Sequence, residues 1–188
     1  MTPCPLSDLL TRAVEWLPPE ASLGSAARRM ADAGISSVVV VRDGRAVGIL
    51  TESDVLQAMR AHRRPDVPVA HVMSAKVVVA SPDMEFRDAY HLAARHHVKH
   101  LVVAGADGAL VGVVTETDFR RHLGVDYFQN LQNVGSLMDR RCPRLPPDAP
   151  LESALRAMET GAGACVVVDP AGRPLGILTE RDVVRLFA

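Results

Sequence analysis

The chain has 188 residues, of which 48% are apolar, with 21 basic and 22 acidic side chains and a net charge of −1. This composition supplies a packed core, and it excludes a basic nucleic-acid footprint and an apolar run of the roughly 18 residues needed to span a bilayer. The three distant cysteines lack CxxC spacing and no signal peptide is evident, so we predict a cytoplasmic protein that binds neither nucleic acid nor membrane.

The predicted elements follow one another in a fixed order. After the prolines at 18–19, apolar residues at helical spacing predict an amphipathic helix over 23–31, and Gly34 suits its end. The β-branched run at 37–41, the turn at 42–45 and the run at 46–50 predict a β-hairpin. A second helical pattern begins at Asp54, and the segment 76–81 predicts the strand that opens the next unit. Each unit is therefore β-α-β-β-α, and the fold class is α+β.

The predicted elements recur in the same order because the chain consists of repeated units. The heptapeptides GILTESD (48–54), GVVTETD (112–118) and GILTERD (176–182) each begin 64 residues after the previous one. Residues 6–55 align without a gap with 134–183 and are identical at 23 of 50 positions. We predict three units, at 6–62, 69–123 and 134–188.

The heptapeptide has two interpretations, which spacing alone leaves open. A Thr followed three residues later by an acid is close to a helix capping box. A Thr hydroxyl and a short carboxylate at a helix N-terminus also suit the phosphate and ribose of a nucleotide, and the preceding Gly permits close approach of a ligand or backbone. The residues concerned are Thr51, Thr115 and Thr179 with Asp54, Asp118 and Asp182.

At this point the chain resembles the cystathionine-β-synthase (CBS) domain family over nearly its whole length. The resemblance rests on the 60-residue β-α-β-β-α unit that ends in G-h-h-[ST]-x-x-D, and on VAHVMSAKVVVASPDMEF (69–86) and LPPDAPLESALRAM (145–158). It implies that units pair into a flat module whose clefts take AMP, ADP, ATP or S-adenosylmethionine. It also implies that the Asp binds the ribose and that the Ser or Thr lies on the phosphate side.

The resemblance further implies that the segment before the second strand frames the adenine. The candidate ligand-binding residues are therefore Thr51, Asp54, Ile35, Ser37, Thr115, Asp118, Val98, His100, Thr179 and Asp182, and a second rank holds Lys99, Arg120, Arg121, Ala164 and Cys165. The first unit departs from the family pattern because it lacks the Val-Met-[ST] lead-in and has Trp16 in its first strand. The third unit has Gly-Ala-Cys (163–165) at the framing segment.

No residue pattern indicates catalysis or a metal site, so we predict a non-enzyme without a cofactor. The histidines of 91–100 lack acidic neighbours at ligand spacing, and the arginine pairs are interpreted as solvated helix ends. The predicted function is a regulatory module that senses an adenine nucleotide and controls an attached or associated effector. The alternatives are a ligand-free dimerisation module and the N-terminal sensory part of a larger signalling enzyme.

The odd number of units predicts a homodimer. Units 1 and 2 are expected to pair, which leaves the helix stripe of unit 3 (Leu151, Ala154, Leu155 and Met158) and its strand run without a partner in the chain. The segment 123–134 carries an apolar stripe at helical spacing, and we expect a helix there, on its own module or at an interface between modules.

Overall fold

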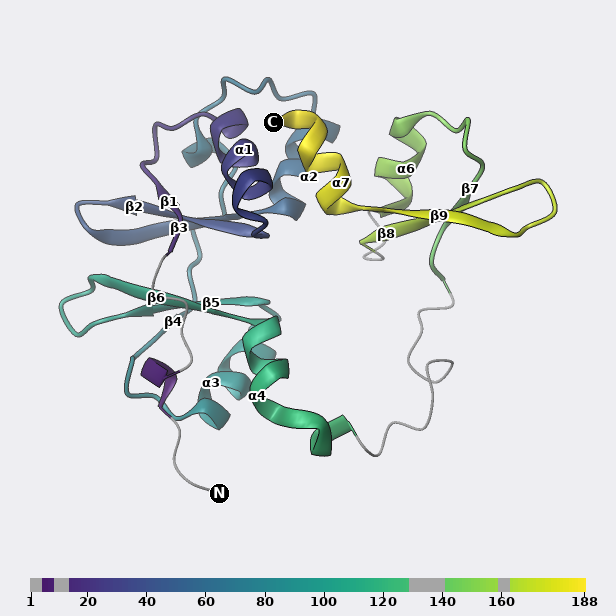
Figure 1. Cartoon of the computed structure of the whole chain (residues 1–188). Coiled ribbons are helices and arrows are strands. Elements are labelled where there is room, and N and C mark those ends of the chain that lie inside the picture. The colour runs from purple at the N-terminus through teal and green to yellow at the C-terminus, as the bar shows by residue number, and fades with distance from the viewer. Residues whose placement is uncertain (1–4, 9–13, 129–140, 159–162) are drawn as a thin grey trace.

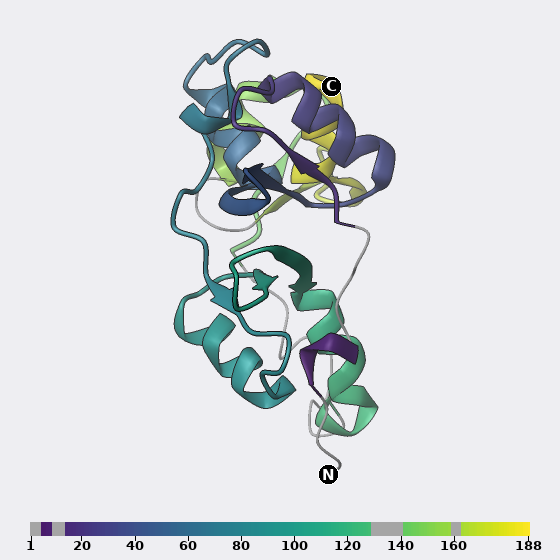
Figure 2. The ribbon, with the colours of Figure 1, turned by 90° about the vertical axis from the view of Figure 1, so that its left-hand side faces the viewer.

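The computed structural model describes residues 5–8, 14–128, 141–158 and 163–188 of the 188-residue chain. Three small units are arranged around a common centre, with unit 2 beneath unit 1 and unit 3 beside unit 1 (Figure 1). Seen from the side, units 1 and 2 form four layers, with helices outside and the two sheets facing each other in the middle (Figure 2).

Unit 1 shows how each repeat is built. A two-residue strand pairs in parallel with the first strand of an antiparallel hairpin, and one helix precedes the hairpin while another follows it. Ser22 caps the first helix by accepting from Ser25 N, and Gly34 ends that helix in the left-handed conformation that glycine favours. The elements are β1 (Trp16–Leu17), α1 (Leu23–Ala33), β2 (Ser37–Arg42), β3 (Arg45–Thr51) and α2 (Glu52–Arg60).

Units 2 and 3 repeat this order, which confirms the α+β prediction. Unit 2 comprises β4 (Val79–Ala80), α3 (Phe86–Arg95), β5 (His100–Ala104), β6 (Leu110–Thr115) and α4 (Glu116–Phe128). Unit 3 comprises β7 (Arg144–Leu145), α6 (Leu151–Met158), β8 (Ala164–Val168), β9 (Pro174–Thr179) and α7 (Glu180–Phe187). The helix expected at 123–134 is present as far as Phe128, and its remainder lies outside the described residues.

The register of unit 3 corrects the gap-free alignment. That alignment places Val38 opposite Val166, whereas strand pairing places Cys165 at the position of Val38, because each pairs with the Leu of its own hairpin partner. The hairpin turn of unit 3 spans 169–173 where unit 1 has only 43–44, so the identity of the two valine runs is coincidental. Ser36 and Ser37 thus correspond to Gly163 and Ala164.

Units 1 and 2 exchange the short turn that precedes each first strand. We call η1 (Leu6–Asp8) and η2 (Val69–His71) the lead-in turns. Val69 N donates to Ala21 O of unit 1 (2.8 Å), and Leu6 N donates to Met84 O of unit 2 (3.0 Å). Both Leu6 and Val69 are fully buried, each in the core of the other unit. The exchange and the apolar contact of the two sheets join units 1 and 2 into a pair.

Unit 3 is not unpartnered, contrary to the expectation behind the predicted homodimer. Its helix α7 packs on α1 and α2, and α6 packs on α2. Ala154, Leu155 and Met158 of the predicted stripe are buried, together with Val183 and Val184, in a single core with unit 1. Leu151 alone of the predicted stripe remains substantially exposed. The helix stripe therefore serves contact within the chain, while Leu175 and Ile177 on the sheet of unit 3 and Leu186 on α7 are exposed.

None of the helices in the described part of the chain combines the length and the apolarity that a membrane span requires.

Candidate functional site

A cleft of about 790 Å³ lies between units 1 and 2, where the N-termini of α2 and α4 approach each other. Its walls carry the Thr and Asp of both heptapeptides, Thr51 with Asp54 and Thr115 with Asp118. Sheet residues Val39, Ile49 and Val113 form an apolar floor. The cleft therefore combines apolar surface with hydrogen-bonding groups, which is the usual make-up of a small-molecule site.

Each heptapeptide forms a complete capping box. In unit 1, Asp54 Oδ2 accepts from Thr51 N (2.8 Å) and from Thr51 Oγ1 (2.7 Å), while Asp54 N donates back to Thr51 Oγ1 (3.4 Å). Asp118 and Asp182 make the same bonds in their units. The Thr hydroxyl hydrogen is therefore engaged within the box, and the carboxylate keeps Oδ1 as its outward acceptor.

The same box stands in different surroundings in units 1 and 3. Burial in the cleft wall raises the pKa of Asp54, although hydrogen bonds from Thr51 oppose this effect. Hydrogen bonds from Thr179 lower the pKa of Asp182, where desolvation is the smaller influence. Ser74, which lies between η2 and β4 of unit 2, donates a long hydrogen bond to Asp54 Oδ1 (3.5 Å). Of these two carboxylates, desolvation dominates at Asp54, and hydrogen bonding dominates at Asp182.

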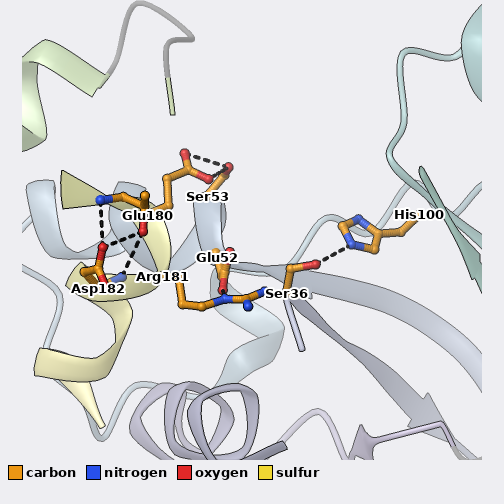
Figure 3. A network of polar contacts seen from close by, with 8 residues as sticks. Ser36, Glu52, Ser53, His100, Glu180, Arg181 and Asp182 are labelled. Carbon is orange, nitrogen blue, oxygen red and sulfur yellow. Dashed lines mark hydrogen bonds and ion pairs between the residues drawn. The ribbon is translucent and has the colours of Figure 1, made fainter. Parts of the chain in front are cut away.

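The framing segments of units 1 and 2 meet across the cleft. Ser36 Oγ lies 2.9 Å from His100 Nε2 (Figure 3). Burial and the neighbouring Lys99 charge lower the pKa of His100, which favours the neutral ring. Ile35 and Val98 line the same region with apolar surface. The site thus combines apolar walls with a neutral imidazole, and such surroundings suit a planar aromatic base.

The structure brings most of the predicted site residues together. Those that line the cleft are Thr51, Asp54, Ile35, Ser37, Thr115, Asp118, Val98, His100, Lys99, Arg120 and Arg121. Thr179, Asp182 and Ala164 belong to unit 3 and do not line it. Cys165 is fully buried in the core, with its Sγ 3.8 Å from Ala154 O, because it takes the inward position of Val38. We therefore leave Cys165 out of the site proposed below.

Unit 3 contributes two residues to the cleft that the sequence analysis did not select. Arg181 Nε lies 3.2 Å from Glu52 Oε1, and Ser53 Oγ donates to the carboxylate of Glu180 (3.0 and 3.1 Å; Figure 3). Glu180 and Arg181 both line the cleft. They occupy the two positions that the pattern G-h-h-[ST]-x-x-D leaves unspecified, although Glu180 recurs as Glu52 and Glu116 in the other heptapeptides.

Lys76 and Ser74 also line the cleft, and both lie between η2 and β4 of unit 2. The positive side chains that line the cleft come from unit 2 and unit 3: Lys76, Lys99, Arg120, Arg121 and Arg181. One carboxylate from each unit also lines the cleft: Glu52, Glu116 and Glu180. In the described part of the chain, no three or more His, Cys, Asp or Glu side chains gather in a way that could hold a metal ion.

The chain matches the family model of the CBS domain at residues 6–61, 69–125 and 134–188. Protein MJ1225 of Methanocaldococcus jannaschii is 26% identical over 98% of this chain and 70% of its own length. Its crystal structure, described as that of a candidate archaeal homolog of g-AMPK, superposes with a TM-score of 0.83 at 20% identity and covers 98% of this chain and 73% of MJ1225.

Two further crystal structures contain adenosine ligands. The CBS domain protein PAE2072 of Pyrobaculum aerophilum, complexed with AMP, has a TM-score of 0.58 at 25% identity, over 61% of this chain and 89% of its own. The CBS domain pair of protein MJ0100, complexed with 5-methylthioadenosine and S-adenosyl-L-methionine, has a TM-score of 0.61 at 21% identity, over 66% and 98%. Given the three matches that span most of the sequence, this chain belongs to the CBS domain family and consists of three tandem CBS units.

Proposed function

We propose that this protein is a regulatory, non-enzymatic module that binds an adenine nucleotide or S-adenosylmethionine in the cleft between units 1 and 2. The observation that carries the proposal is the convergence of two Thr-x-x-Asp boxes and two framing segments on one cleft. The adenosine ligands of two structural relatives support the choice of ligand class. AMP, ADP, ATP and S-adenosylmethionine are the candidates.

In this proposal each carboxylate binds ribose hydroxyls through Oδ1. Asp118 is the best placed, because nothing in the described part of the chain donates to its Oδ1, whereas Ser74 approaches that of Asp54. The apolar surface of Val98 and the neutral ring of His100 border the adenine in unit 2. Cationic side chains at the rim, Arg120 and Arg121 among them, attract the phosphate tail.

The module would pass the ligand signal to an effector in the cytoplasm through unit 3. Glu180 and Arg181 border the ligand space and also hold unit 3 against α2. A phosphate that attracts Arg181 would weaken its contact with Glu52 and so alter how unit 3 lies on unit 1. The effector is either attached to this chain, as in a larger signalling enzyme, or associated with it.

Titration calorimetry with AMP, ADP, ATP and S-adenosylmethionine tests the proposal. Asp118→Ala should weaken binding roughly 10- to 100-fold, the effect of losing charge-assisted hydrogen bonds to ribose. Asp182→Ala is the matched control, since it removes the same capping box from a unit outside the cleft, and affinity should not change. The 2′-deoxy form of the bound nucleotide should also bind distinctly worse.

Absence of heat with all four ligands would favour the alternative of a ligand-free interaction module. An equal loss of nucleotide affinity in Asp118→Ala and Asp182→Ala would mean that the Thr-x-x-Asp motif has only a structural role. The complete capping box of Thr179 and Asp182 in unit 3 supports such a structural role there.

A further inference from the structure

A second cavity, of about 650 Å³, lies between units 1 and 2 beside their hairpin turns, which point to the same side of the molecule (Figure 1). The two hairpins touch there, because Leu110 N of unit 2 donates to Gly44 O of unit 1 (3.2 Å). The cleft described above lies at the opposite ends of the same strands, where β3 and β6 lead into α2 and α4. Among the described residues, Val14 alone lines both spaces. The cavity is therefore separate from the candidate nucleotide site.

Trp16 lines this cavity and is the only tryptophan of the chain. Leu17, the next residue of β1, is buried in the core, so Trp16 lies on the other face of the strand, where its side chain is 51% exposed. Strand pairing places Val79 of unit 2 and Arg144 of unit 3 at the position of Trp16. A CBS unit of this chain therefore folds without an aromatic residue there, and packing does not account for Trp16.

The backbone of Trp16 is anchored, whereas its ring is not engaged. Arg29 Nη1 donates to Trp16 O (3.1 Å) and to the carboxylate of Glu15 (3.1 Å). Within the part of the chain that the structure describes, the indole ring makes no hydrogen bond and has no aromatic or cationic partner. An indole that is fixed at its backbone and open at its ring is preorganised to receive a ligand.

The remaining walls of the cavity are mostly apolar, and part of them is rigid. Two consecutive prolines follow β1, and their rings fix the backbone at this edge. The hairpins of both units supply branched aliphatic side chains. These wall residues are Pro18, Pro19, Val41, Leu110 and Val111. Apolar walls with a few polar groups, around a space of this size, are typical of a small-molecule site.

The charges that line the cavity leave one carboxylate without compensation. Arg42 Nη2 lies 3.5 Å from Glu20 Oε1, so these two charges offset each other. Asp43 also lines the cavity, and none of the described residues forms an ion pair or hydrogen bond with its carboxylate. Asp43 and Gly44 form the hairpin turn with φ values of 52° and 75°, a conformation that an Asp-Gly pair favours. The turn thus sets an uncompensated negative charge on the cavity that Trp16 borders.

We propose that this cavity binds a small organic cation with apolar substituents, of the trimethylammonium class. The face of the Trp16 indole attracts a cation through its quadrupole, and the Asp43 carboxylate offsets the ligand's charge. The prolines and aliphatic side chains cover the alkyl groups. An anionic ligand fits less well, because the cationic side chain of the lining, Arg42, is already paired. The inference is independent of nucleotide sensing, since it concerns a different space.

Fluorescence titration with choline tests the proposal, because Trp16 is the only tryptophan to report. The probe is choline chloride, with sodium chloride at the same concentration as the reference for ionic strength. Dimethylbutanol, the isostere with carbon in place of nitrogen, is the uncharged comparison. Choline should change the emission of Trp16 saturably, and the isostere should bind about tenfold more weakly or worse. Equal binding of the two, or no saturable response to choline, would overturn the proposal.

Three variants locate the site. Asp43→Asn keeps the turn, since Asn-Gly suits the same conformation, and should weaken choline binding by about tenfold. Asp107→Asn is the matched control: Asp107 precedes Gly108 in the equivalent turn of unit 2 but does not line the cavity, so the affinity should not change.

Trp16→Val introduces the residue that unit 2 has at this position and should abolish binding. Because this variant lacks the fluorophore, binding to all variants is followed by broadening of the choline methyl signal in NMR spectra. Choline affinity that survives Trp16→Val would place the cation elsewhere and overturn the proposal. Equal losses of affinity in Asp43→Asn and Asp107→Asn would reduce the effect to overall charge and would also overturn it.

Discussion

Arg181 of α7 forms an ion pair with Glu52 at the first turn of α2, with 3.2 Å between Nε and Oε1. The side chain of Glu52 is only 13% exposed and that of Arg181 is 47% exposed. Burial raises the pKa of Glu52, and the bond to Arg181 opposes this rise. One polar contact thus joins two CBS units directly beside the candidate ligand space.

Removing one partner of the Glu52–Arg181 ion pair should lower the free energy of unfolding more than removing both partners. Arg181→Gln should lower the free energy of unfolding by about 1 kcal/mol or less, because the arginine is half exposed and solvent screens the pair. Glu52→Gln together with Arg181→Gln should recover part of this loss, since no buried carboxylate is then left unpaired. A double-mutant cycle by urea denaturation measures the coupling. A coupling of zero would mean that the pair does not hold unit 3.

The two capping boxes predict opposite pH dependences. The pKa of Asp54 is raised above 3.8, so its contribution to stability is present below pH 3.8 and is lost as the pH rises through the folded value. The pKa of Asp182 is lowered, so its contribution is present above pH 3.8 and is lost as the pH falls through its folded value. Asp54→Asn should therefore gain stability relative to wild type as the pH rises, and Asp182→Asn should lose it.

Urea denaturation of the three proteins from about pH 3 to pH 7 checks this prediction. Constant differences between Asp and Asn cancel, because only the change with pH is compared. Parallel curves for the two variants would show that the cleft does not distinguish Asp54 from Asp182.

The lowered pKa of His100 predicts that the protein loses stability on mild acidification. Burial and the charge of Lys99 lower its pKa below 6.5, while Glu116 and Asp118 oppose the shift. The stability that the neutral ring contributes is therefore present above pH 6.5 and is lost as the pH falls through the folded pKa. His100→Gln should flatten the stability curve in this range. An NMR titration of the His100 ring that gives a midpoint at or above 6.5 would contradict the expectation.

The heptapeptide glycines predict unequal mutational effects at equivalent positions. Gly48→Ala should destabilise by about 1 to 3 kcal/mol, because the added methyl group overlaps Met73 and forces it from a packed place. Gly176→Ala should be neutral or slightly stabilising, since its surroundings are open and alanine costs less backbone entropy in a strand. Thermal unfolding of both variants provides the comparison. Equal losses of stability in the two variants would refute the inference that Gly48 is needed for the close approach of Met73.

Much of the fold followed from local patterns in the sequence. The strands of each hairpin and the helices that flank it have short-range signals, in alternation, helical spacing and turns, and these were confirmed. The register of unit 3 was not, because a run of valines aligns with itself at more than one offset. Only the pairing of Cys165 with Leu178 reveals that this thiol points into the core.

The arrangement of the units could not be read from the repeats. Leu155 and Val183 show that unit 3 uses its helices as the contact, yet its sheet is equally apolar and pattern alone does not choose between them. Arg181 lies at the cleft only because unit 3 contacts unit 1 through its helices and not through its sheet. The exchanged lead-in turns likewise leave no local sign, since Leu6 is an ordinary apolar residue until Phe86 is placed beside it in one core.

The exchanged lead-in turns also bear on how the chain folds as it is synthesised. Unit 1 closes its core only when Val69 and Met73 have left the ribosome, and Leu6 has no place to bury until the helix that begins at Phe86 exists. Leu6 and Phe86 are 80 positions apart and Leu23 and Val69 are 46 apart, and such separations raise the contact order and slow the final step. The smallest independently folding piece is therefore the pair rather than the repeat, and proteolytic or genetic cuts at residues 62–68 should release aggregation-prone fragments.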